Sequence, residues 1–124
     1  MEHCDETEVH TATAGVIGAI IPMTEETYDY YSKGLSQYEL GEYEQAIQDF
    51  GEAIRLDPQN YLAYIARGEA YASLDQYERA IQDYDEAIRL DQQDALAYIG
   101  RGVAYASLDQ DEQAIQDYDE AIRL

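Results

Sequence analysis

The chain is poor in basic residues, with seven Lys and Arg against 27 Asp and Glu, so its net charge is −20 over 124 residues. A field of this sign repels phosphate backbones and anionic lipid headgroups. The composition therefore disfavours nucleic acids and membrane surfaces as partners and favours encounter with a basic protein segment. The alternative is that the acidity serves only to keep the protein soluble.

Cysteine and extended apolar segments are also scarce. Cys4 is the single cysteine, which excludes an internal disulfide framework. The apolar stretch at residues 12–23 has 12 residues, too few to span a bilayer. The amino terminus is acidic, which argues against a secretory signal or a transit peptide. These features predict a soluble, cytoplasmic protein.

Motifs for catalysis and metal binding are missing from the rest of the chain. It contains no nucleophile–base pair, no glycine-rich phosphate loop and no spacing typical of metal ligands. The cluster with thiol and imidazole groups, His3, Cys4 and His10, has an order that does not fit a compact structural zinc site. We therefore expect neither an enzyme nor a metal or cofactor site.

The chain is rich in internal repetition. Residues 61–90 recur at residues 95–124, 34 positions later, with 25 of 30 residues identical. Residues 27–56 form a third copy that matches 61–90 at 14 of 30 positions. A unit this short cannot bury its own apolar face, so consecutive units must stack into a solenoid. Solenoids mainly offer extended surfaces to other molecules.

Each repeat is predicted to form two antiparallel helices joined by a short turn. Thr24, Asn60 and Asp94 are suited to cap the first helix of each pair, and Pro58 cannot continue a helix. The expected helices are residues 24–40, 43–56, 60–74, 77–90, 94–108 and 111–124. Residues 24–124 then form three repeats (27–60, 61–94 and 95–124). Residues 1–23 form a tail that is either flexible or packed on the repeats or on a neighbouring chain.

Small residues recur where helices should approach closely. A glycine lies inside the first helix of each pair, and its recurrence predicts close approach of the second helix at an alanine. The glycines are Gly34, Gly68 and Gly102, and the alanines are Ala46, Ala80 and Ala114. Large rings at Phe50, Tyr84 and Tyr118 are expected to fill the remaining space.

Two arginines precede these glycines. Arg67 and Arg101 should be largely buried, and a buried guanidinium needs a carboxylate. Asp49, Asp83 and Asp117 recur at a suitable position, so we predict a ladder of Arg–Asp pairs that holds the repeats together, with Lys33 as a weaker counterpart. The functional alternative is a row of arginines that binds anions.

The pattern of aromatic, glycine and alanine positions resembles the tetratricopeptide repeat family over residues 27–124. In the second repeat the matching residues are Tyr64, Gly68, Tyr71, Ala80, Tyr84 and Ala87. Gln92 replaces the proline found at Pro58, and Asp111 replaces a tyrosine. The resemblance implies an all-α, right-handed superhelical solenoid of three antiparallel helix pairs, uncapped at its C-terminus. It also implies a ligand on the concave surface, which is lined by the first helices.

The resemblance assigns a peptide-binding groove to the following residues: Tyr28, Tyr31, Leu35, Tyr38, Leu62, Ile65, Glu69, Leu96, Ile99 and Val103. The places where the family clamps a terminal carboxylate hold Tyr31, Leu35, Ala66, Leu96 and Gly100, and none of them is a cation. We therefore expect a non-catalytic scaffold that binds an apolar or amphipathic peptide with basic flanks, rather than an acidic tail.

Self-association is the alternative function. Two apolar surfaces lack an obvious cover, the tail and the last helix. The candidate residues are Val16, Ile17, Ile20, Ile21, Tyr118 and Ile122. They could meet within one chain or between chains as a homo-oligomer. The remaining possibility is that the sequence is a fragment of a longer array whose tail is disordered.

Overall fold

The computed structural model describes residues 23–124, and all the regular structure in that range is helical. The helices are α2 (Glu25–Glu39), α3 (Tyr43–Leu56), α4 (Tyr61–Ser73), α5 (Tyr77–Leu90), α6 (Ala95–Ser107) and α7 (Asp111–Arg123). Each range agrees with the helix predicted from the sequence to within a residue or so at either end.

Side-chain caps start the first helix of each pair. Thr24 Oγ1 accepts a hydrogen bond from the backbone N–H of Thr27 at 3.2 Å. Asn60 Oδ1 and Asp94 Oδ1 do the same for the N–H groups of Leu62 at 3.1 Å and Leu96 at 2.9 Å. Each cap satisfies a donor that has no partner inside the helix and contributes about 1 kcal/mol.

A residue with left-handed backbone ends the first helix of each pair. These residues are Gly41, Asp75 and Asp109, with φ of 78°, 59° and 60°. In the second repeat the N–H of Gln76 then bonds back to the carbonyl of Tyr71 at 2.9 Å, which closes the helix end. Glycine adopts this conformation freely and aspartate tolerates it, so the chain reverses within a few residues.

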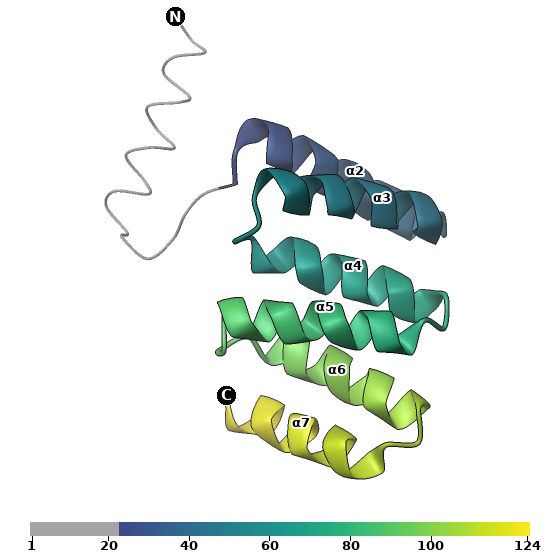
Figure 1. Cartoon of the computed structure of the whole chain (residues 1–124), viewed down its shortest axis with the longest axis vertical. Coiled ribbons are helices and arrows are strands. Elements are labelled where there is room, and N and C mark those ends of the chain that lie inside the picture. Colours follow the sequence, from purple (N-terminus) through teal and green to yellow (C-terminus); the bar gives the residue numbers. More distant parts are fainter. Residues whose placement is uncertain (1–22) are drawn as a thin grey trace, which may run out of the picture.

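The helices stack in chain order (Figure 1). Within the repeats α2 packs on α3, α4 on α5 and α6 on α7, and between repeats α3 packs on α4 and α5 on α6. The first helices also touch, α2 with α4 and α4 with α6. The result is an all-α solenoid of three helix pairs, as predicted, with α2, α4 and α6 side by side along one surface.

Each core cluster crosses a joint between repeats. Phe50 and Ala46 of α3 are fully buried against Ala66 and Ala70 of α4. Tyr84 of α5 is the large ring of the next cluster, which joins residues from α4, α5 and α6. Its buried members are Ile65, Ala80, Tyr84, Ala87 and Ala97. Because the apolar surface is buried between repeats, a single repeat cannot be stable alone.

The helical glycines make room for the large rings of the second helices. A Cβ added to Gly34 would lie 2.6 Å from the Phe50 ring, and one added to Gly68 would lie 3.0 Å from the Tyr84 ring. At Gly102 the Tyr118 ring would be 2.8 Å away. The ring one turn beyond each alanine makes the tightest contact, and at Gly102 the backbone carbonyl of Ala114 also lies 3.3 Å from the added Cβ.

Candidate functional site

Apolar side chains are exposed along the surface made by α2, α4 and α6. In each of these helices the exposed positions are seven residues apart, so they lie on one helical face. We call this surface the first-helix face; its members are Tyr28, Leu35, Leu62, Glu69, Leu96, Ile99 and Val103. Leu96 is the most open of them, with 62% of its surface exposed. An apolar strip of this kind suits a peptide with apolar anchors.

Tyr31 and Tyr38, also predicted for the groove, are half-buried. The Tyr31 ring lies 5.9 Å from the Phe50 ring, and the Tyr38 ring lies edge-on to Tyr43 at 5.2 Å. Ser73 Oγ is 3.4 Å from Tyr38 Oη, within reach of a hydrogen bond between α4 and α2. Both tyrosines therefore belong to the edge of the core and present only part of their surface to a ligand.

Ile65 lies in the core rather than on the first-helix face. Only 5% of its surface is exposed, because it packs into the cluster that contains Tyr84 and Ala97. Ile99, at the same position of the next repeat, is 43% exposed. Ile65 is covered because α6, the first helix of the next repeat, packs over it, whereas residues 23–124 contain no first helix beyond α6 to cover Ile99.

Glu69 is the one acidic member of the first-helix face. The residues at its position in the flanking repeats are Leu35 and Val103. Desolvation by the surrounding protein raises the pKa of the Glu69 carboxyl above its ordinary value. Its negative charge is close enough to raise the pKa of the Tyr31 hydroxyl as well, after the larger effect of burial on that group. A cation placed beside Glu69 would relieve this penalty.

The two half-buried arginines are engaged by carboxylates. Arg67 donates from Nε and Nη2 to the two oxygens of Asp83, both at 2.8 Å. Arg101 donates in the same way to Asp117, at 2.9 and 2.7 Å. Both aspartates are buried. The Arg–Asp pairs predicted from the sequence therefore exist, which leaves these guanidinium groups committed to the structure rather than free to bind an anion.

The details of the ladder differ from the prediction. Each bidentate pair joins the two helices of one repeat, and the link between repeats is a third contact, from Arg101 Nη1 to Asp85 at 2.8 Å. Lys33 is exposed, and within residues 23–124 no ion pair joins it to Asp49. The sequence did not indicate Asp85 as a partner, because the pair forms only when the next repeat brings Arg101 to it.

Free positive charge is rare on the described surface. Three further arginines make exposed pairs with a glutamate three residues earlier: Arg55 with Glu52, Arg89 with Glu86, and Arg123 with Glu120. Arg79 stacks over the Tyr71 ring at 5.7 Å. An acidic ligand would therefore find little to bind.

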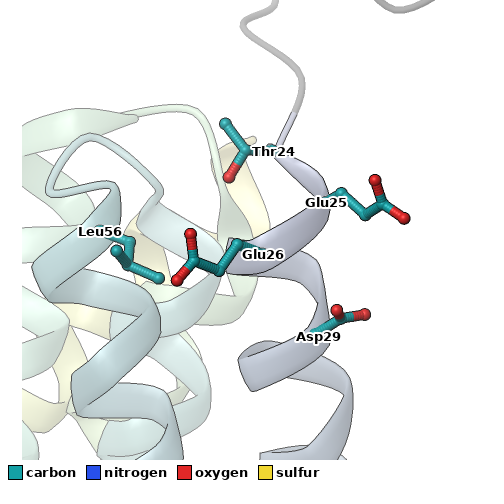
Figure 2. A pocket seen from close by; sticks show the side chains of 5 residues that line it. All are labelled: Thr24, Glu25, Glu26, Asp29 and Leu56. Atoms are coloured by element: carbon teal, nitrogen blue, oxygen red, sulfur yellow. The ribbon is translucent and has the colours of Figure 1, made fainter. Parts of the chain in front are cut away.

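A depression at the start of α2 is lined by acidic side chains (Figure 2). It lies between Thr24, Glu25, Glu26 and Asp29 of the α2 end and Leu56 of α3. Glu25 and Asp29 point away from α3, so the carboxylates do not converge (Figure 2). Across residues 23–124 no group of three or more His, Cys, Asp or Glu could hold a metal ion.

Of the six residues predicted for self-association, two lie within the described part of the chain. Val16, Ile17, Ile20 and Ile21 lie outside the described residues. On α7, Tyr118 is half-buried, whereas Ile122 is 83% exposed and its neighbour Ile115 is 57% exposed. The outer face of α7 therefore carries more exposed apolar surface than any comparable second helix in the described part. None of the helices described there is long and apolar enough to cross a membrane.

The model of the tetratricopeptide repeat family matches residues 31–95 and 74–124. No curated protein gives a significant match. Among solved structures, the second TPR of Spaghetti (RPAP3), bound to the HSP90 peptide SRMEEVD, is 30% identical with a TM-score of 0.79, covering 81% of this chain and 93% of that one. Its first TPR with the same peptide is 27% identical (TM-score 0.79; 80% and 79% covered).

The TPR domain of Arabidopsis OM64 is similarly related. It is 30% identical with a TM-score of 0.80, covering 81% of this chain and 83% of that one. The match of the family model over most of the repeats agrees with these structural similarities and with the helix pairs described above. The chain therefore belongs to the tetratricopeptide repeat family.

Proposed function

We propose that the chain is a protein-interaction scaffold whose first-helix face binds an apolar or amphipathic peptide segment with basic flanks. The observation that carries the proposal is the exposed apolar strip across α2, α4 and α6, anchored by Tyr28, Leu62 and Leu96. Exposed apolar surface of this extent on successive elements is typical of an interaction site. The peptide-bound Spaghetti domains support the choice of this class of function.

The charge proposed for the ligand rests on the residues of the first-helix face. The HSP90 peptide bound by the Spaghetti domains, SRMEEVD, is acidic. On the first-helix face of this chain the charged member is Glu69, and no member is basic. The net charge of −20 adds long-range repulsion of an acidic peptide. We therefore propose basic flanks, with one lysine or arginine of the peptide beside Glu69.

The test uses fluorescence anisotropy with labelled 15-residue peptides. Each carries the same apolar centre with either lysine or glutamate flanks, and SRMEEVD is a further probe. We expect the lysine-flanked peptides to bind at least tenfold more tightly than the others at low salt, with the difference shrinking as salt is added. Equal binding of both flank types, or preference for SRMEEVD, would contradict the proposal.

Variants locate the binding surface. Leu96→Asp and Val103→Asp should each weaken binding by about tenfold, because each places a charge against an apolar ligand. Both residues are exposed, so the fold should persist. Ile122→Asp is the matched control, since it changes an exposed isoleucine on another face. Loss of binding in the control, but not in the two variants of the first-helix face, would place the ligand elsewhere.

Self-association through α7 is the second candidate function, favoured by the exposure of Ile115 and Ile122. Light scattering over a concentration series, on residues 1–124 and on a chain that starts at Thr24, tests it. Association of the full chain alone would assign the tail as the internal ligand. Association of both chains would indicate that the α7 face forms the interface. If both chains stay monomeric at every concentration, this function is excluded.

A further inference from the structure

The first-helix face departs from the repeat pattern at the joint between α2 and α4. These two helices touch, as do α4 and α6. Glu69 stands on α4 at the position that Leu35 occupies in α2 and Val103 occupies in α6. The second repeat thus places a carboxylate where both flanking repeats carry an aliphatic side chain.

Two tyrosines of α2 depart from the pattern beside it. The positions of Tyr31 and Tyr38 hold isoleucine and alanine in both later repeats. The two tyrosines are seven residues apart, so they lie on one face of α2. Both pack against the core cluster that contains Ala66 and Ala70 of α4. The first repeat therefore directs two phenol groups toward the helix that carries Glu69.

The carboxylate and the two hydroxyl groups lie near one another. Glu69 is one turn before Ser73 on α4, and Ser73 Oγ is 3.4 Å from Tyr38 Oη. The charge of Glu69 also acts on the Tyr31 hydroxyl and raises its pKa, after the larger effect of burial. Three side chains with oxygen acceptors, from two helices, are thus gathered at the α2–α4 joint.

The Glu69 carboxylate has no cationic partner among the described residues. The ion pairs of residues 23–124 do not include it. Desolvation raises its pKa, and no neighbouring charge or hydrogen bond opposes that shift. The side chain is nevertheless exposed. An accessible carboxylate that the protein desolvates is unfavourable in the free chain, and a bound cation would compensate it.

The acceptors at this joint suit an ammonium group better than a guanidinium group. An ammonium is a compact charge with three donors on one nitrogen, whereas a guanidinium is a planar fork that binds a carboxylate through two parallel hydrogen bonds. Two separate hydroxyls beside one carboxylate match the three donors. Because exposed apolar residues continue on α6, a bound peptide runs past this joint, which favours a lysine side chain over a free amino terminus.

We infer that the α2–α4 joint is a lysine-selective subsite of the first-helix face, in which Glu69 pairs with the ammonium group of a partner peptide and Tyr31 and Tyr38 accept its other hydrogen bonds. The inference rests on the proposed function, because it names the group that the bound peptide places beside Glu69. It goes further by separating lysine from arginine and by assigning the tyrosines to that selection.

The probes are labelled, acetylated 15-residue peptides of one apolar sequence, in which a single lysine, arginine or norleucine is moved from position to position. Binding to the full chain is followed by fluorescence anisotropy. At the best position, lysine should bind about fivefold more tightly than norleucine and about threefold more tightly than arginine. A lysine-free peptide with an unblocked amino terminus should bind no better than norleucine, and tight binding of it would overturn the assignment to a side chain.

The outcomes separate this inference from the proposed function. Binding of the norleucine, lysine and arginine peptides with equal affinity would overturn the subsite, while the apolar face would still bind peptides. Equal affinity for lysine and arginine, both above norleucine, would overturn the selectivity and retain the ion pair. If none of the peptides binds, the proposed function and the subsite are both wrong.

Variants of the chain assign the two roles. Glu69→Leu, which copies the residue of α2, should lower the affinity for the lysine peptide to that for the norleucine peptide. Tyr31→Phe combined with Tyr38→Phe should keep the preference for a cation but remove the preference for lysine over arginine. If the double variant still prefers lysine about threefold, the hydroxyls do not accept from the ammonium.

The α4–α6 joint supplies the matched control. Val103→Glu in the Glu69→Leu chain moves the carboxylate to the equivalent position of that joint, where Ile65 and Ala72 replace the two tyrosines. This chain should again prefer a cation to norleucine, but it should bind the lysine and arginine peptides equally. A preference for lysine as large as that of the unchanged chain would overturn the role of the tyrosines.

Thermal unfolding gives a readout that needs no ligand. Glu69→Gln should raise the melting temperature of the free chain, because it removes a desolvated charge without a partner. A lower melting temperature would show that the carboxylate stabilises the fold, and would overturn its assignment to a ligand.

Discussion

The two joints between repeats use equivalent helices but place their central ring differently. At the α3–α4 joint, Phe50 lies against Gly34 of its own repeat, 2.6 Å from where a Cβ would be. This position leaves room for the methyl group of Ala66 in the next repeat, which packs in the same cluster. The ring is held by its own repeat, and the neighbouring repeat fits around it.

At the α5–α6 joint the ring lies closer to the neighbouring repeat. Tyr84 is 2.5 Å from the Cβ position of Gly100 and 3.0 Å from that of Gly68 in its own repeat. Asp85 of this joint also receives Arg101, whereas Gly51 stands at the same position of the first joint. The second joint thus adds an ion pair between repeats, which the first joint lacks within residues 23–124. Residues at the same position of different repeats can therefore make different contacts, because the neighbouring repeat supplies part of each contact.

Removing the half-buried arginine of α4 or of α6 should have the largest effect. Arg67→Ala leaves Asp83, and Arg101→Ala leaves Asp117, as a buried carboxylate without its partner, which costs about 3–5 kcal/mol. The extra contact of Arg101 with the half-exposed Asp85 should add less than about 1 kcal/mol to its loss. Urea unfolding followed by circular dichroism measures both.

The conservative variant Asp117→Asn serves as a control for this prediction, since it keeps shape but removes the charge. It should cost less than Arg101→Ala, because Arg101 keeps its ion pair with Asp85 whereas Arg101→Ala leaves the buried Asp117 without a partner. If Arg67→Ala and Arg101→Ala both unfold at the urea concentration of the unchanged chain, the pairs contribute nothing to the stack.

Adding a methyl group beside the ring should affect the stability of the first and second repeats differently. Gly34→Ala should lower the free energy of unfolding by about 1–2 kcal/mol, since overpacking outweighs the gain of about 1 kcal/mol in helix propensity. Gly68→Ala should be nearly neutral, because its Cβ would overlap the Tyr84 ring less severely. Equal losses of stability in the two variants, measured by thermal unfolding, would show that the rings do not differ in position.

A double-mutant cycle tests whether Tyr84 can move between its two glycines. Gly100→Ala alone should push the ring toward Gly68, into the arrangement that Phe50 adopts beside Gly34. With Gly68→Ala also present the ring has no free side, so the double variant should lose about 1 kcal/mol more than the sum of the single variants. Additive losses would indicate a ring that stays in place.

Transferring the ion pair to the first joint should have the smallest effect. A Cβ added to Gly51 would lie 3.5 Å from Arg67 Nη1 and meet nothing else, so Gly51→Asp can copy the contact made by Asp85. Gly51→Ala is the matched control for helix propensity. The aspartate should gain a few tenths of a kcal/mol over the value expected from propensity, and lose it at high salt. A gain insensitive to salt would exclude the ion pair.

Much of the fold follows from local signals in the sequence. Thr24, Asn60 and Asp94 cap helices as their residue types predict, and the 34-residue recurrence fixes the order of the helices. The Arg–Asp pairing within repeats was also predictable, because a guanidinium beside a packing glycine must be compensated. These features depend on one or two residues at a fixed separation.

Two features that the sequence did not predict depend on a neighbouring repeat. Ile65 and Ile99 occupy the same repeat position, yet one is buried and the other exposed, because α6 covers only the first. Asp85 becomes an ion-pair partner only when the next repeat brings Arg101 to it. The left-handed turns at Asp75 and Asp109 carry a weaker signal than Gly41, since aspartate adopts this backbone less readily than glycine.

Within residues 23–124, α7 contacts α6 and no other helix, which has a consequence for the order in which these helices unfold. In a linear stack the free energy of releasing an end unit is set by a single interface, whereas an inner unit must break two. Amide hydrogens of α7 should therefore exchange with solvent first, followed by those of α6, while α3, α4 and α5 retain protection longest. Unfolding would then begin at α7 and proceed helix by helix toward the centre of the stack.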